Sequence, residues 1–89
     1  MNDTTINFNF SNGIFSAAVV PSFSEKPYYF FIQFNEAEII SEFGDELSIA
    51  TNGDTILNSI PTDNKVKSLK EVIFQEIKKV PEFLDKLKN

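Results

Sequence analysis

The sequence predicts an α+β domain, in which a mainly antiparallel sheet of about five strands carries one C-terminal amphipathic helix on one face. Two Asn-Gly pairs, at 12–13 and 52–53, each lie between runs rich in apolar residues, and the last third of the chain has apolar residues at helical spacing. The chain has 89 residues, which predicts a single domain spanning residues 1–89. With 42% hydrophobic and 24% charged residues, the composition is typical of a globular domain.

The first two strands are predicted on either side of Asn12-Gly13, in the stretch INFNFSNGIFSAAVV at residues 6–20. Asn-Gly is the preferred loop of a two-residue type I′ hairpin, because both loop positions require positive φ. Closing the hairpin there pairs Phe10 with Phe15. The apolar residues of both strands then share one face, while the Asn and Ser residues share the other, so we expect a sheet with one buried face.

The third strand is predicted at residues 28–34, YYFFIQF, after a loop at 21–27 that has a proline at each end. A half-buried strand requires apolar residues on alternate positions only, yet aromatic residues occupy both parities here. One parity continues the apolar face of the first hairpin. The other parity points to the second face of the sheet and is our candidate interaction surface: Tyr29, Phe31 and Gln33.

Residues 35–44, NEAEIISEFG, are compatible with a helix or with a strand. As a helix, the segment has Asn35 as its N-cap and ends at Gly44, whereas as a strand it would turn after Gly44. Glu and Ala are poor strand formers, so we expect the helix. The second Asn-Gly pair then predicts a hairpin with strands at 47–51 and 54–59.

The last third of the chain predicts one helix of about 20 residues. Ser68 and Glu71 have the spacing of a capping box at the start of a helix. Pro81 lies inside the helical pattern and lacks a backbone N–H, so we expect a kink or a break near Val80. Seven apolar residues give the pattern: Leu69, Val72, Ile73, Ile77, Val80, Leu84 and Leu87.

The composition argues against an enzyme and against a cofactor or metal site. The chain contains no His and no Cys, and all eight of its basic residues are Lys. The commonest general base, the commonest nucleophile arrangements and the thiolate zinc site are therefore excluded. Five acidic residues lie close together without the spacing and central glycine of a calcium loop, so we expect a solvated acidic surface and no metal: Glu36, Glu38, Glu42, Asp45 and Glu46.

Charge is distributed unevenly along this acidic chain, whose net charge is −5. Residues 1–64 have nine acidic residues against one lysine, whereas residues 65–89 have seven lysines against four acidic residues. We expect the basic helix to neutralise the sheet that it packs on rather than to bind nucleic acid, because the overall acidity repels phosphate groups. No run approaches the ~20 apolar residues of a membrane span, and the start of the sequence lacks a basic signal region, so we expect a cytoplasmic protein without membrane contact.

One helix covers only one face of a sheet, so the aromatic residues of the second face need another cover. Three covers are compatible with the sequence. The loop 21–27 with Phe23, or the segment 36–43, folds over the second face; a second copy of the chain packs on it as a symmetric dimer; or another partner or ligand binds there.

The sequence therefore predicts a small non-enzymatic protein-interaction module whose partner is a second copy or another protein. The alternative is a ligand-binding or accessory domain that holds a small apolar molecule between sheet and helix, near Tyr28 and Phe34. Both hypotheses predict no catalytic residue and no cofactor.

Overall fold

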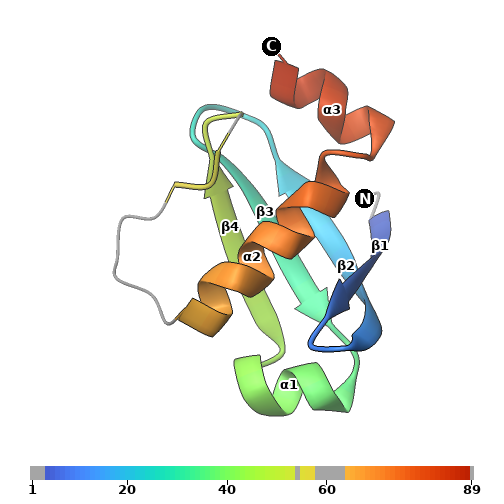
Figure 1. Ribbon diagram of the computed structural model, residues 1–89. Helices are drawn as coiled ribbons and strands as arrows, with labels where there is room; N and C mark the ends of the chain where they lie inside the picture. The colour runs from blue at the N-terminus through green and yellow to red at the C-terminus, as the bar shows by residue number, and fades with distance from the viewer. Residues whose placement is uncertain (1–3, 54, 58–63, 89) are drawn as a thin grey trace.

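The computed structural model describes residues 4–53, 55–57 and 64–88 (Figure 1). The described part of the chain has one antiparallel sheet with strand order β1-β2-β3-β4. The predicted α+β class, with an antiparallel sheet and a C-terminal helix, is confirmed, but the described sheet has four strands where about five were predicted. The elements in order are β1 (Thr4–Phe10), β2 (Gly13–Ser22), β3 (Tyr28–Phe34), α1 (Ala37–Phe43), β4 (Glu46–Thr51), α2 (Asn64–Ile77) and α3 (Pro81–Lys88).

The first hairpin closes at Ser11-Asn12 and not at the predicted Asn12-Gly13. Phe10 pairs with Gly13, and the two residues between them have φ angles of 51° and 64°. Positive φ at both positions is what a type I′ loop requires. The predicted register was therefore wrong by two residues. Because side chains alternate with a period of two, the apolar residues still share one face, as predicted.

Gly13 has a different role from the one that the sequence suggested. It is the first residue of β2, and its φ is not positive. A Cβ atom at this position would lie 2.9 Å from the ring of Phe15, which itself pairs with Phe8 across the hairpin. The rings of Phe8 and Phe15 have centroids 6.0 Å apart. The glycine thus leaves room for an aromatic cross-strand contact, which favours the observed register.

The observed loop is open to improvement, because Ser and Asn occupy positions where Asn and Gly are preferred. We expect the double change Ser11→Asn with Asn12→Gly to raise the free energy of unfolding by roughly 0.5–1 kcal/mol. Urea unfolding measures this effect. Asn12→Ala is the matched control and should lower the stability by about 1 kcal/mol, because alanine resists positive φ. Equal stabilities for the two variants would contradict the loop assignment.

The short helix α1 begins after Glu36 and not after Asn35 as predicted, and its end at Gly44 is confirmed. Gly44 has a φ of 88°, and its N–H donates to the carbonyl oxygen of Ile40 at 2.9 Å. The Glu36 side chain does not cap the helix. Its Oε2 instead accepts a hydrogen bond from the backbone N–H of Ser16 at 3.0 Å. The pairing of β2 with β3 ends at Ala17 and Phe34, so the N–H of Ser16 lies beyond the last residue of β3. The Glu36 carboxylate takes the place of a strand partner for this N–H.

The second Asn-Gly pair does not form the predicted two-residue hairpin. Thr51 pairs with Ile56 in an isolated bridge, so the chain reverses over four residues, and the predicted strand 54–59 lies partly outside the described residues. The buried Thr51 hydroxyl donates to the carbonyl of Thr55 at 2.6 Å and accepts from the N–H of Gly53 at 3.0 Å. Gly53 has a φ of 119°, and a Cβ atom there would lie 2.9 Å from the carbonyl oxygen of Leu87 in α3.

The predicted C-terminal helix is two helices, α2 and α3, separated at Val80. This break was predicted, because Pro81 cannot continue a helix but is well suited to the first position of a new one, where an N–H would be unpaired anyway. The predicted capping box was wrong. α2 has already begun at Asn64, so Ser68 lies inside the helix.

The core lies between the first face of the sheet and the helices, with α2 running across that face (Figure 1). The loop before β3 contributes to it through Phe23, and α3 contributes Phe83. Pro21 and Ser22, predicted in that loop, extend β2 instead, where Pro21 pairs with Phe30. The largest fully buried apolar side chains are Phe8, Val19, Phe30, Ile32 and Ile49 from the sheet and Leu69, Ile73 and Ile77 from α2.

Candidate interaction surface

The second face of the sheet is the face opposite α2, and it is formed by alternate residues of all four strands. The strand register aligns these residues in rows across the sheet, such as Val20, Phe31 and Ser48. The face consists of Thr5, Asn7, Asn9, Ile14, Ser16, Ala18, Val20, Ser22, Tyr29, Phe31, Gln33, Glu46, Ser48 and Ala50. All three predicted surface residues therefore lie on it.

The exposed large hydrophobic residues of the described chain gather on this face. Ile14 is 76% exposed, Tyr29 41% and Phe31 46%. Leu57, at 40%, lies opposite Ala50, whose carbonyl accepts its N–H at 2.8 Å, and so extends the same face beyond β4. Ile14 lies near the hairpin end of β2, six residues from Val20, and is therefore apart from the other three. Tyr29, Phe31 and Leu57 lie at neighbouring positions, and an apolar cluster of this kind indicates an interaction site, whereas a single exposed apolar residue does not.

Tyr29 and Phe31 form an aromatic ridge on β3. Their ring centroids are 6.3 Å apart, and the ring planes differ by only 12°. The cross-strand neighbours of the ridge are small: Ser22 and Ala50 beside Tyr29, and Val20 and Ser48 beside Phe31. The two rings therefore stand above the surrounding surface.

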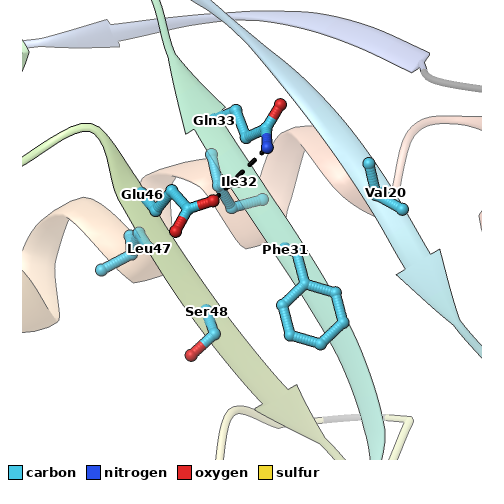
Figure 2. A pocket seen from close by; sticks show the side chains of 7 residues that line it. All are labelled: Val20, Phe31, Ile32, Gln33, Glu46, Leu47 and Ser48. Carbon is cyan, nitrogen blue, oxygen red and sulfur yellow. Dashed lines mark hydrogen bonds between the residues drawn. The ribbon is translucent and has the colours of Figure 1, made fainter.

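A shallow hollow of about 640 Å³ lies beside Phe31 (Figure 2). Val20 on β2 and Ser48 on β4 lie on either side of Phe31, and both line the hollow (Figure 2). Its polar end is formed by Gln33, whose Nε2 donates to Oε1 of Glu46 at 3.4 Å. Among the described residues, Glu46 is the one charged residue on the second face, and it lies at this polar end, away from Val20 and the Phe31 ring.

Neither segment that we expected to cover the second face does so. Phe23, in the loop before β3, packs against Phe30 and Phe83 with ring centroids 5.4 and 6.1 Å away. Phe43 in α1 packs against Phe10, with centroids 5.7 Å apart. These contacts lie on the helix-covered side of the sheet. Within the described residues, the aromatic ridge is left about half exposed.

The positions predicted to hold a small apolar ligand are in contact with other rings of the protein. Tyr28 packs edge to face against Phe23, with centroids 5.2 Å apart, and Phe34 packs against Phe8 at 6.3 Å. Both residues thus take part in the aromatic packing between sheet and helices.

Three of the five clustered acidic residues bond to different neighbours. Glu36 accepts from Ser16 of β2, Glu46 accepts from Gln33 of β3, and Glu42 forms an exposed ion pair with Lys65 at 3.1 Å. Such exposed pairs contribute little to stability. Across residues 4–53, 55–57 and 64–88, no group of three or more His, Cys, Asp or Glu side chains could hold a metal ion.

The chain matches no protein-family model, no curated protein and no solved structure at a significant level. Of the helices that the structure describes, none is long and apolar enough to cross a membrane.

Sequence reasoning found the aromatic ridge but missed other members of the face. Val20 and Ser48 were not predicted because their place beside Phe31 depends on the register between β2, β3 and β4. Leu57 lies within the predicted strand 54–59, but that strand was not assigned to a face; the observed bridge and its hydrogen bond to Ala50 place it beside β4. Ile14 could have been found, since the alternation of the first hairpin already places it opposite the apolar face.

Proposed function

We propose that the chain is a small non-enzymatic, cytoplasmic protein-interaction module that self-associates through the second face. One observation carries the proposal: the exposed large hydrophobic residues of the described chain lie on the sheet face opposite the helices. An antiparallel sheet is ordinarily apolar on its covered face and polar on its free face. Packing against another molecule would remove this apolar surface from water.

A second copy of the chain is the partner that best suits the chemistry of the face. Apart from Glu46, its polar residues are Asn, Gln, Ser, Thr and Tyr, whose side chains both donate and accept hydrogen bonds. Such a surface is complementary to itself under two-fold rotation. Two molecules with a net charge of −5 also repel each other less where their contact surfaces are nearly uncharged.

The hollow beside Phe31 offers a position for the corresponding ring of the second copy. A two-fold axis near Phe31 would place each ring beside the other ring and over the partner's hollow, as in aligned sheet packing. Four strands about 4.8 Å apart, with about seven residues of 3.3 Å rise in a typical strand, give a plan area of roughly 400–450 Å² per copy. This is a small interface, so we expect a weak dimer at micromolar concentration.

Phe31→Lys tests the proposal, because it places two ammonium groups near the two-fold axis of the dimer. Their repulsion and desolvation should cost several kcal/mol and break the contact through the second face, so that the mass of the assembly falls by half. Each chain should stay folded, since the core on the other face is unchanged. The measurements are sedimentation-equilibrium mass and far-UV circular dichroism at matched concentrations.

Two controls separate loss of association from loss of folding and from added charge. Phe30→Lys places a charge in the core and should unfold the chain. Gln75→Lys adds the same charge at an exposed position of α2 and should leave the mass unchanged. A wild-type chain that stays monomeric through high micromolar concentration would overturn self-association. If Phe31→Lys unfolds the chain, the second face is part of the folded core and the proposal is wrong.

A further inference from the structure

Within the described residues, the strand β1 forms an edge of the sheet that lacks the usual protection. Residues 4–24, which include all of β1 and β2, contain no charged residue. β1 pairs continuously with β2 from Thr4 to Phe10, without a bulge or a proline. Sheet edges are ordinarily protected by Lys, Pro, bulges or a covering segment, because their unpaired backbone groups can bind another strand.

The opposite edge, β4, has the protection that β1 lacks. Its first residue, Glu46, is negatively charged, whereas no residue of β1 is charged. At its end, Thr51 pairs with Ile56, and the carbonyl of Ala50 accepts a hydrogen bond from the next residue of the returning chain. The two edges of the same sheet thus differ in both charge and covering.

The backbone groups that β1 presents at its edge follow from the bond between Ser16 and Glu36. Because Glu36 follows β3, the N–H of Ser16 points away from β1. Along a strand, the backbone N–H and C=O groups of successive residues point alternately to one side and to the other. Two directly paired residues point these groups either both toward each other or both away from each other. Asn7, the partner of Ser16, therefore points its N–H and C=O away from β2. By the same alternation, Thr5 and Asn9 also direct their backbone groups outward.

We propose that β1 pairs antiparallel with β1 of a second copy, around a two-fold axis at Asn7. This pairing places Asn7 opposite its own copy and Thr5 opposite Asn9, so the polar residues stay on the second face and Ile6 and Phe8 stay on the first. Antiparallel pairing of identical strands is isologous and therefore closed. The absence of charge in residues 4–24 favours a second copy, because two acidic molecules meet there without repulsion between side chains at the contact.

The β1 edge and the second face are separate surfaces, so one copy can pair with β1 while another packs on the second face. Edge pairing would join two four-stranded sheets into one of eight strands, with both second faces on the same side. Packing of two such sheets through the second face gives a dimer of dimers. This inference goes beyond the proposed function, and a test can separate the two interfaces.

Four chains provide the test: wild type, Asn7→Pro, Phe31→Lys and the double variant. Proline at position 7 removes an N–H that points out of the sheet, so the edge is blocked while the β1–β2 ladder is kept. At high micromolar concentration we expect a wild-type mass of four times 10.1 kDa. Each single variant should halve this mass, and the double variant should reduce it fourfold.

The outcomes distinguish the edge proposal from the face proposal. If Asn7→Pro is folded and leaves the mass unchanged, the edge proposal is wrong, whereas an unchanged mass for Phe31→Lys overturns only the face. Amide hydrogen exchange of the wild type tests the edge without a variant: the amides of Thr5, Asn7 and Asn9 should exchange at least tenfold more slowly on assembly. If these amide hydrogens exchange fast at every protein concentration, β1 does not pair with a second copy and the proposal is wrong.

Discussion

Phe30→Ala is expected to lower the free energy of unfolding by about 3–5 kcal/mol. The Phe30 ring is fully buried and packs against Phe23 at 5.4 Å and Phe83 at 5.3 Å. It therefore joins three segments, namely β3, the loop before it and α3. Its removal leaves a cavity that none of these segments can fill without moving.

The neighbouring Phe31→Ala is the matched control for this prediction. It deletes the same ring one residue away, on the opposite face, where nearly half of the side chain is exposed. In dilute, monomeric protein we expect a cost below about 1 kcal/mol. Guanidinium unfolding of both variants measures the difference. Since a domain of this length has a stability of only about 5–13 kcal/mol, Phe30→Ala should shift the midpoint severely. Comparable losses for the two variants would contradict the assignment of faces.

The assignment of residues to the two sheet faces was predictable from the sequence, whereas the pairing of strands was not. Side chains alternate between the two faces with a period of two residues. Ile6, Phe8 and Phe15 therefore share a face in the predicted register and in every register shifted from it by an even number of residues. The loop choice between Ser11-Asn12 and Asn12-Gly13 depends on where the Phe15 ring packs. That is a tertiary contact, and turn preferences do not contain it.

The course of the last third was predictable only in part for a similar reason. Proline at position 81 locally forbids a continuous helix, so the break was predictable from one residue. α2 already includes Asn64, four residues before Ser68, and the Ser68–Glu71 spacing imitated the start of a helix inside it. Helix boundaries depend on packing as much as on caps.

The candidate surface was predictable where it depends on a single strand. Tyr29 and Phe31 lie on β3, and their parity alone indicates an exposed aromatic pair. The hollow beside them and the unprotected edge of β1 depend on the order and register of four strands. Both proposed contacts therefore require the structure.

Gly53→Ala is expected to lower the stability by at least about 2 kcal/mol, for two independent reasons. A φ of 119° lies in a region that residues with a Cβ avoid. In addition, the new Cβ would lie 2.9 Å from the carbonyl oxygen of Leu87, which is backbone and cannot rotate away. The end of α3 would have to move from the turn after β4, and the Thr51 hydroxyl would lose its geometry with the Gly53 N–H.

Gly44→Ala separates these two contributions. Gly44 also has positive φ, at 88°, but no atom lies within 4 Å of the position that its Cβ would occupy. Backbone strain alone should cost roughly 1–2 kcal/mol there. For a domain of this size, 1 kcal/mol corresponds to a shift of about 4–8 °C in the thermal midpoint. Calorimetry should therefore show a clearly larger decrease for Gly53→Ala than for Gly44→Ala. Equal decreases would mean that α3 yields to the added methyl group without cost, and that the contact between Gly53 and Leu87 does not hold α3 against the sheet.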